Sequence, residues 1–492
     1  MSRVCVIGAG LGGLALAIRL QARGIACTLI EAQDRPGGWA RGFEAEGFTF
    51  DTGPAALGEP ALWRELWSDA GRELGDDVEL LPIAPLCRFH WPDGTQFDLV
   101  ADDAALLPEI ARIAPGDLAG YEDFASYTAE VQAEGFRHRL AAGAGWRPMA
   151  AAIPGLLRLQ AFRSLHGRVS GFVRSERLRQ VLASSPLVTG GNPFTVSAIA
   201  AAAHRREREV GLWYPRGGFS ALARAMAGLF EALGGELRLG DAVRRIHLLG
   251  NRVSAVECAS GWHQRVEALA IAADLMHAYR DLLDGQPPGP AVAQRLARRR
   301  WSPSVFTVHF ALAGSWPGLA HRTLMLGPRF KALLDDIFGF GVLPRDAMIW
   351  LSHPSVTDPS LAPPGKSVFQ AVMPVAHLGH LPIDWAAVGP RIAARILDEI
   401  GRRFIPDIHD RILFCRSATP RDHAAALNLW QGSAYGLEPL PAAALWLQPT
   451  TRDGRLGNLF RVGAGIRPGA GIAAVLTSAS LAARQLGSEL GG

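Results

Sequence analysis

The sequence predicts an α/β fold, and matching patterns at the two ends of the chain carry this prediction. Near the N-terminus, the β-rich run 3–7 leads through a glycine-rich turn into an amphipathic helix over 14–24, and a second β-rich run, CTLIEA, follows. Near the C-terminus, residues 458–462 read as a strand, 463–471 as a glycine-rich loop and 473–486 as a helix. The 492 residues suffice for two or three domains of about 150 residues each.

Composition excludes several protein classes. Apolar residues make up 49% of the chain and charged residues 20%, which excludes a disordered protein. No run of about 18 apolar residues indicates a spanning helix, and the opening MSRVCVIGAG lacks the apolar core of a signal peptide, so we expect a cytoplasmic protein. The net charge of +4 either favours an anionic membrane surface or reflects an Arg-rich composition alone. We expect no nucleic-acid partner and no bound metal, because no His/Cys/Asp grouping has metal-ligand spacing.

The N-terminal pattern predicts a binding site for a dinucleotide. Gly8, Gly10 and Gly13 occupy the GxGxxG positions between strand and helix, and Gly12 lies in the same turn. The first glycine permits the tight turn, the second lets the backbone approach a pyrophosphate, and the third lets the helix pack closely on the sheet. The helix N-terminus offers free N–H groups and a partial positive charge to the phosphates. Glu31 ends the second strand, where a carboxylate accepts hydrogen bonds from the adenosine ribose and disfavours NADP.

Two further turns favour FAD over NAD. Gly37 and Gly38, in the segment RPGG, form a second glycine pair that lets the chain pass close to the cofactor, which is typical of flavoproteins. Gly53 and Pro54 end the segment GFTFDTGP, which reads as a strand leading into a tight turn. We expect this turn to meet the edge of a non-covalently bound flavin.

The C-terminal loop predicts a second helix N-terminus at the same cofactor. This loop contains four glycines, Gly463, Gly465, Gly469 and Gly471, and the helix begins at Gly471 and Ile472. The N–H groups of Gly471 and Ile472 are expected at the pyrimidine edge of the flavin, where negative charge collects on reduction. The alternative is an ordinary strand–loop–helix connection that binds no ligand.

Several motifs, in order along nearly the whole chain, carry a resemblance to a known family. They are GAGLGGLALAIRL, RPGG, GFTFDTGP, WPDGTQFDL, GGNPFTVSAI, GLWYPRGG, ADLMHAYRDLL, QGSAYGLEP and VGAGIRPGAGI. Together they resemble the bacterial phytoene desaturase family, the FAD-dependent carotenoid desaturases and isomerases of the flavin amine oxidase-like superfamily.

The resemblance implies a discontinuous FAD-binding domain of Rossmann type with an inserted α+β substrate domain. We place the FAD-binding domain at residues 1–80, 212–285 and 455–492, and the substrate domain at 81–211 and 286–454. Val243 matches the position whose backbone meets the adenine in related flavoproteins, although a plain core valine is the alternative.

Some residues depart from the family pattern near the expected cofactor. Trp39 follows the double glycine where the family usually has a phosphate-facing Arg, and Arg41, two residues on, is expected to replace it. In the C-terminal loop, Ile466 and Arg467 replace Thr and His, and Ala473 replaces Pro. These departures affect the expected choice of substrate more than FAD binding, since the glycines are intact.

The resemblance also implies a reaction. Desaturation of a long polyene such as phytoene, in carotenoid biosynthesis, requires hydride transfer from an allylic C–H to the flavin N5 and loss of a proton. Asp51, Arg216 and Glu438 lie inside family-like motifs beside the expected cofactor loops, and are candidate catalytic residues. Each also has a structural interpretation: a turn cap for Asp51, an arginine at a helix-start turn for Arg216, and a cap or surface residue for Glu438.

The segment 153–174 predicts a basic amphipathic helix that contacts a membrane. The stripe at 3.6-residue spacing consists of Leu159, Phe162, Leu165, Val169, Phe172 and Val173. Such a helix lies in the headgroup region of a bilayer, where a carotenoid dissolves. We therefore expect a peripheral protein of the cytoplasmic membrane, with an ordinary core-facing helix as the alternative.

Other functions fit parts of the pattern. A carotenoid isomerase or hydroxycarotenoid dehydrogenase of the same superfamily is the nearest enzyme alternative. A small-substrate amine oxidase would need an aromatic cage at the flavin, which we do not find in the sequence. A lipid carrier that keeps the FAD fold without catalysis is the non-enzyme alternative, against which the intact glycines and Glu31 argue.

Overall fold

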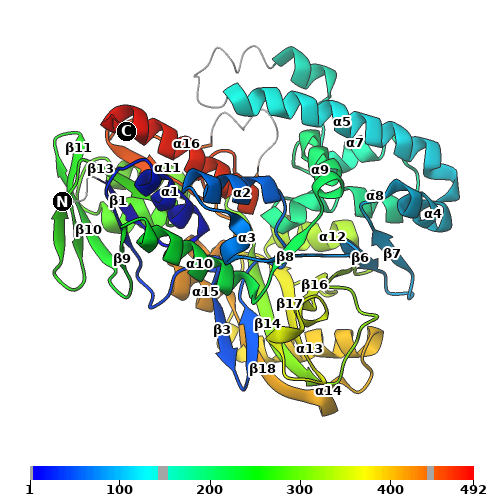
Figure 1. Ribbon diagram of the computed structural model, residues 1–492. Coiled ribbons are helices and arrows are strands. Elements are labelled where there is room, and N and C mark those ends of the chain that lie inside the picture. Colours follow the sequence, from blue (N-terminus) through cyan, green and yellow to red (C-terminus); the bar gives the residue numbers. More distant parts are fainter. Residues whose placement is uncertain (1–3, 142–152, 440–447, 492) are drawn as a thin grey trace.

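Both ends of the chain contribute to one parallel sheet. The computed structural model describes residues 4–141, 153–439 and 448–491, with side chains of 136–141 left out (Figure 1). Five strands pair in parallel in the order β19-β13-β1-β2-β9. Their bounds are β1 (Val4–Ile7), β2 (Cys27–Ile30), β9 (Glu236–Arg238), β13 (Ala268–Ile271) and β19 (Leu459–Arg461). Strands from both termini and from the middle of the chain therefore build one sheet.

The alternation of side chains along the central strand β1 assigns the two faces of this sheet. Val4 and Val6 pack into the core formed with the helices α1 (Leu11–Ala22), α10 (Gly218–Ala232) and α16 (Ile472–Leu490). Cys5 and Ile7 pack on the opposite side, against an antiparallel sheet of β10 (Val243–Leu249), β11 (Arg252–Cys258) and β12 (His263–Arg265). All four residues of β1 are buried, as expected of a parallel sheet covered on both faces.

Close packing at the start of α1 requires glycine at two positions. A Cβ atom on Gly13 would lie 1.9 Å from the carbonyl oxygen of Gly8, so the helix could not rest against the preceding turn. A Cβ atom on Gly12 would lie 2.7 Å from Cγ1 of Val475 in α16. The glycines of this turn therefore bring the first turns of α1 and α16 side by side.

A second, mixed sheet forms the lower part of the molecule in Figure 1. Its strand order is β18-β14-β17-β16-β15-β6-β7. The bounds are β6 (Cys87–His90), β7 (Gln96–Leu99), β14 (Ser304–Ala313), β15 (Arg322–Met325), β16 (Ile349–Ser352), β17 (Lys366–Val375) and β18 (Ile412–Ala418). One face of this sheet packs on α13 (Trp385–Arg403), through Phe306 and Val308 of β14 and Phe369 and Ala371 of β17. The intervening residues of both strands point to the opposite face.

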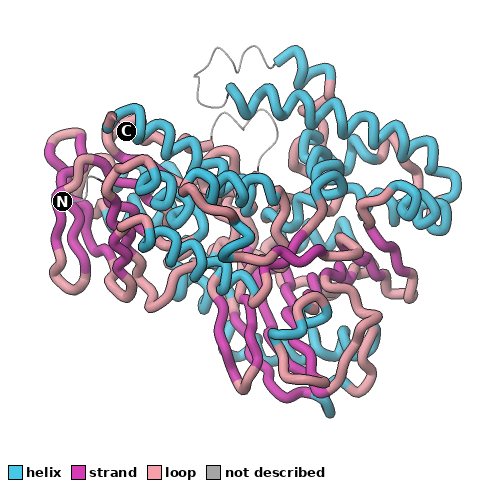
Figure 2. The backbone as a smooth tube through the Cα atoms, viewed as in Figure 1, coloured by secondary structure: helices cyan, strands magenta, loops and turns pink. Residues whose placement is uncertain are grey.

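Helices gather at the end of this sheet farthest from the chain termini, as Figure 2 shows. They are α4 (Asp103–Ile113), α5 (Leu118–Ala141), α7 (Leu165–Val169), α8 (Glu176–Leu182), α9 (Ala202–Val210) and α12 (Phe330–Asp335). Smaller elements connect the two sheets, namely β3 (Gly42–Ala45), β4 (Phe48–Asp51), α2 (Pro60–Asp69), α3 (Leu74–Asp77), β5 (Leu80–Pro82), β8 (Trp213–Pro215), α11 (Gly289–Ala297) and α15 (Pro420–Leu427), and α14 (Ile408–Arg411) lies between α13 and β18. The predicted fold class, a Rossmann-type unit with an α+β insertion, is confirmed.

The single helix predicted over 153–174 is wrong. The structure has a helical stretch at 153–158 and a separate helix α7, with a turn at Gln160, whose φ is +52°. Tertiary contacts cause this break: the hydroxyl of Tyr127 donates to the carbonyl of Leu159 (2.9 Å), and Ser164 forms a bridge with Ser197 before capping α7. Within the described residues, no helix is long and apolar enough to cross a membrane.

Candidate cofactor and substrate site

A cavity of about 1440 Å³ lies between the two sheets and is lined by residues of both. This volume exceeds the roughly 300–1,000 Å³ of a typical small-molecule pocket, and leaves room for a dinucleotide together with a second, elongated ligand. The cavity begins at the glycine turn before α1 and extends across the open face of the seven-stranded sheet to α9.

The N-terminal glycine segments form one wall of the cavity. Gly10 pairs with Gly37 in a parallel bridge, and the N–H of Gly37 donates to the carbonyl of Ala9 at 2.8 Å. Backbone therefore lies against backbone, and α1 begins at the cavity with its first N–H groups lacking acceptors within the helix. This is the geometry that receives a phosphate group.

Glu31 lies beside this turn and is oriented by the backbone. Its carboxylate accepts hydrogen bonds from the N–H groups of Ala9 (2.8 Å) and Gln33 (2.9 Å). One N–H group meets each oxygen, so each oxygen keeps lone pairs free to accept a further hydrogen bond. Glu31 also lines the cavity, which suits an acceptor for two ribose hydroxyls.

The C-terminal loop approaches the same part of the cavity. A Cβ atom on Gly12 would lie 3.1 Å from Val462 and 4.0 Å from the Cα of Gly463, so the two turns are in contact. Gly471 and Ile472 both line the cavity where α16 begins. Two helix N-termini thus face one space, and both favour a ligand that carries negative charge.

Nearly all of the predicted cofactor residues line this cavity. They are Gly8, Gly10, Gly12, Glu31, Gly37, Gly38, Gly53, Pro54, Val243, Gly463, Gly465, Gly471 and Ile472. Gly13 instead contacts the preceding turn, and Gly469 lies between the lining residues Pro468 and Ala470. Arg41 is half-buried outside the lining and donates to Gln33 Oε1 at 3.4 Å. Their individual contacts with a cofactor stay predictions.

The departures from the family pattern divide into two groups. Trp39 and Ala473 line the cavity. Ile466 is buried in the core beneath the three-stranded sheet, and Arg467 donates to the carbonyl of Gln448 at 3.3 Å. Only the first two therefore alter the surface that a ligand meets.

The half of the cavity away from the glycine turns has a floor that the sequence did not predict. Its floor residues alternate along three neighbouring strands and lie opposite the core of α13: Val305 and Thr307 on β14, Gln370 and Val372 on β17, and Trp350 and Ser352 on β16. The opposite wall is one face of α9, formed by Ala203, Arg206, Glu207 and Val210. A weak signal in β14 separates its two faces, because the polar Thr307 and His309 alternate with Phe306, Val308 and Phe310.

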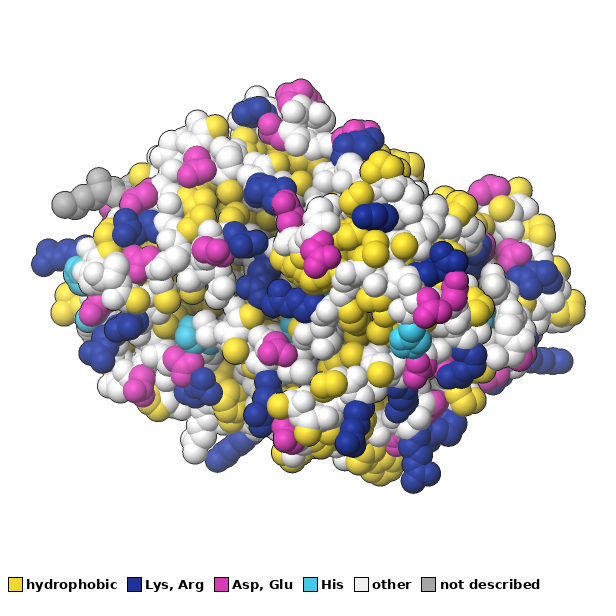
Figure 3. Space-filling model, turned by 90° about the horizontal axis from the view of Figure 1, so that it is seen from below, with side chains coloured by type: hydrophobic (Ala, Val, Ile, Leu, Met, Phe, Trp, Pro, Cys, Tyr) yellow, Lys and Arg dark blue, Asp and Glu magenta, His cyan; other side chains and the backbone are white. Residues whose placement is uncertain are grey.

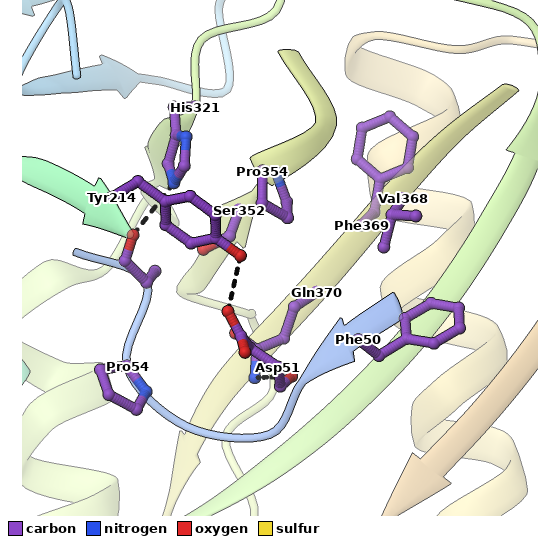
Figure 4. A pocket seen from close by; sticks show the side chains of 11 residues that line it. Phe50, Asp51, Pro54, Tyr214, His321, Ser352, Pro354, Val368, Phe369 and Gln370 are labelled. Carbon is purple, nitrogen blue, oxygen red and sulfur yellow. Dashed lines mark hydrogen bonds between the residues drawn. The ribbon is translucent and has the colours of Figure 1, made fainter. Parts of the chain in front are cut away.

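Asp51 lies behind the cavity rather than in its lining. The Tyr214 hydroxyl donates to Asp51 Oδ2 at 2.6 Å (Figure 4). The N–H of Ser220 donates to Oδ1 at 3.4 Å. Burial raises the pKa of the Asp51 carboxyl to about 6, although both hydrogen bonds favour its charged form. Asp51 borders a small void of about 10 Å³, which is room for one water molecule.

The other two catalytic candidates also lie outside the cavity lining. Arg216 is half exposed and donates to Glu79 at 2.5 Å, with Asp358 at 3.7 Å. Glu438 is buried, and its carboxylate accepts from Arg300 Nε at 2.7 Å; burial raises the pKa of this carboxyl. The structure therefore does not bring the three candidates together, and a catalytic role for each stays a prediction.

The geometry of Glu31 yields a test of the cofactor site. Glu31→Arg removes the ribose acceptor and places a cation beside the adenosine, so FAD retention should fall by about tenfold or more. Flavin content per chain after gel filtration measures this. Glu44→Arg, the same charge change at an exposed residue outside the cavity, is the control. Equal flavin content in the two variants would rule out the ribose assignment.

Comparison with known proteins identifies the family. The sequence matches the family described as flavin containing amine oxidoreductase over residues 11–487. It is 42% identical to a phytoene desaturase (lycopene-forming) from Paracoccus sp. over 491 residues, which cover 99% of this chain and 97% of the relative. A phytoene desaturase (lycopene-forming) from Pantoea ananas is 40% identical, covering 98% of both chains. A phytoene desaturase (neurosporene-forming) from Cereibacter sphaeroides is 36% identical, covering 98% of this chain and 94% of the relative.

Solved structures agree on the fold. Putrescine oxidase bound to putrescine aligns with a TM-score of 0.66 at 15% identity, covering 100% of this chain and 99% of that structure. Cyclohexylamine oxidase from Brevibacterium oxydans aligns with a TM-score of 0.61 at 19% identity, covering 99% of each chain.

The cofactor follows from the family and the site together. The matched family is a flavin family, and a cavity that begins at a dinucleotide turn suits FAD rather than FMN, so the chain is an FAD-dependent oxidoreductase. By its sequence over nearly its whole length, it belongs to the flavin containing amine oxidoreductases and, among them, to the phytoene desaturase family.

Proposed function

We propose that this chain desaturates a long hydrophobic polyene such as phytoene, in carotenoid biosynthesis. The observation that carries the proposal is the single cavity that runs from the dinucleotide turn to the sheet floor. A polyene lying along this floor reaches the flavin without crossing solvent. Relatives named phytoene desaturase, at 40–42% identity over nearly the whole chain, support the same substrate class.

When bound, FAD would supply the redox chemistry as the hydride acceptor for an allylic C–H bond, and loss of a proton from the adjacent carbon would leave the electron pair of that second C–H bond as the new C=C bond. The residues of this chain bind the cofactor, orient the polyene against it and exclude water from the site. We assign the ribose to Glu31, the adenine to the backbone at Val243, the flavin edge to Gly53 and Pro54, and the pyrimidine end to the N–H groups of Gly471 and Ile472.

One observation favours an oxygenated polyene as a second candidate. The hydroxyl of Thr307 and the indole N–H of Trp350 have no hydrogen-bond partner within the described residues, and both side chains line the cavity. Such donors could meet a hydroxyl or carbonyl group of a hydroxycarotenoid. Phytoene has no such group, so a direct comparison of the two substrates separates the candidates.

Expression in cells that make phytoene tests the proposed reaction. We expect coloured products with more conjugated double bonds than phytoene, detected by chromatography with absorbance spectra. The control is Gly13→Val, in which the added side chain overlaps the Gly8 carbonyl and closes the dinucleotide turn. Conversion of acyclic hydroxycarotenoids but not of phytoene would favour the second candidate, and no conversion of either would refute the reaction.

We further propose that the protein binds the surface of the cytoplasmic membrane, where the polyene dissolves. Ile153, Leu157 and Phe162 are exposed by 45%, 59% and 65%, although a large apolar side chain is normally buried. The exposed Arg163 lies beside them and suits anionic headgroups, whereas the exposed Arg158 pairs with Glu130 at 3.1 Å. The segment lies at the top of Figure 1, whereas the underside in Figure 3 mixes basic, acidic and apolar side chains without one continuous apolar patch.

Flotation with phosphatidylglycerol vesicles tests the membrane proposal. Wild type should float with the vesicles. Leu157→Asp combined with Phe162→Asp should reduce the bound fraction by about fivefold or more. Each change removes apolar area that the bilayer would bury and adds a negative charge that the anionic lipid repels. Leu249→Asp changes another exposed leucine, at the end of β10, and should float like wild type. If the double variant also floats like wild type, this segment is not the contact.

A further inference from the structure

The loop after β4 is held at both ends by backbone contacts. At its start, the N–H and hydroxyl of Thr52 both donate to the carbonyl of Arg41, at 3.1 and 2.6 Å. At its end, Leu57 exchanges two backbone hydrogen bonds with Trp213, both of 2.8 Å. Residues 52–56 between these anchors all line the main cavity. The position of this short stretch therefore sets one boundary of the space beside the flavin.

Between the two anchors, a histidine from the other sheet contacts the loop. His321 directly precedes β15 and is only 1% exposed. Its Nε2 lies 3.0 Å from the carbonyl oxygen of Ala55, and its Nδ1 lies 2.8 Å from the hydroxyl of Thr357. A carbonyl oxygen only accepts, so Nε2 carries the proton and donates. Burial lowers the pKa of His321 to about 3, so the ring is neutral and Nδ1 accepts from Thr357.

The surroundings of His321 connect the loop to Asp51. The ring of His321 meets the edge of Tyr214, with centroids 4.9 Å apart, and the Tyr214 hydroxyl donates to Asp51 (Figure 4). Gln370 of β17 donates to the carbonyl of Asp51 at 3.3 Å, from the seven-stranded sheet. Hydrogen bonds from the second sheet thus hold the chain both before and within the loop.

The small void behind the loop gives it somewhere to move. This void of about 10 Å³ lies between the loop and the seven-stranded sheet, and is lined by Asp51, Tyr214 and His321. Pro54 and Ala55 line both the void and the main cavity, so they form a thin wall between the two. Without the His321–Ala55 hydrogen bond, this wall could retreat toward the void and water could enter.

We propose that His321 is a positioning residue that holds loop 52–56 forward, and so sets the distance between the flavin and the polyene on the sheet floor. This inference rests on the proposed function, since it assigns the loop to the flavin. His321 acts through Ala55 and does not touch the reacting atoms. Displacements of about 1 Å at a reacting centre can lower a rate by about a hundredfold, so one hydrogen bond at this wall has a measurable effect.

Three variants separate positioning from simple packing. His321→Leu removes both hydrogen bonds, whereas His321→Gln keeps an amide N–H that can donate to Ala55. His353→Leu is the matched control: His353 is also buried, and burial lowers its pKa to about 4, but it hydrogen-bonds to the carbonyl of Leu319 and lies outside the cavity lining. Two readouts are needed: the visible circular dichroism of bound FAD, and the rate of anaerobic flavin reduction by phytoene in liposomes.

We expect every variant to keep FAD. His321→Leu should change the visible circular dichroism and reduce flavin at saturating phytoene at least about tenfold more slowly, with little change in KM. His321→Gln should stay within about threefold of wild type and keep its dichroism, and His353→Leu should do the same. Wild-type rate and dichroism in His321→Leu would overturn the inference, as would equal losses in His321→Leu and His353→Leu.

Two further outcomes, a variant that does not fold and a wild-type protein that does not react with phytoene, can be told apart from a failure of the inference. If His321→Leu fails to fold, Thr357→Val decides, because it removes only the donor to Nδ1; a dichroism change there supports the inference and wild-type dichroism overturns it. If wild-type FAD is not reduced by phytoene at all, the proposed function fails, while the dichroism of the variants still tests the position of the loop.

Discussion

The contact between the first turns of α1 and α16 is the constraint on which the site depends. Gly12 allows Val475 and Val462 to approach the glycine turn, and Gly13 allows α1 to lie against the Gly8 carbonyl. A side chain at Gly12 would separate two helix N-termini that otherwise face one space, and one at Gly13 would push α1 away from the glycine turn. Since each terminus carries partial positive charge, their approach is unfavourable without an anionic ligand between them. The same contact that closes the fold therefore creates a site for a dinucleotide.

The second sheet extends this site in a different way. Alternate residues of β14 and β17 face α13, which leaves the others free to line the cavity. The end at the glycine turns is built from backbone and glycine, whereas the far end, where we propose that the substrate binds, is built from side chains. Substrate choice can thus change through residues such as Thr307 and Trp350 without disturbing the turns that bind the nucleotide. This division agrees with a family whose named members form lycopene, neurosporene or zeta-carotene.

The sequence allowed the cofactor end to be predicted because its signals are local. Gly8 to Gly13 and Glu31 lie within one βαβ unit, where spacing along the chain determines spacing in the fold. Thr307 and Gln370 could not be identified in this way, because they reach the cavity through strand pairing between distant segments of apolar sequence. The amphipathic stripe over 153–174 led to the wrong prediction of one continuous helix for a related reason. Contacts from Tyr127 and Ser197, which both lie outside this segment, break the helix. Arg216 and Glu438 lie in family-like motifs yet form ion pairs outside the cavity, so a motif alone did not place them at the site.

Identification of the nucleotide released from the purified protein tests the central claim most directly. Acid denaturation followed by chromatography should yield close to one FAD per chain, with neither FMN nor NAD. A folded protein that releases no FAD, and takes up none when titrated with it, would contradict the account, because two helix N-termini would then meet without the ligand that their charge requires.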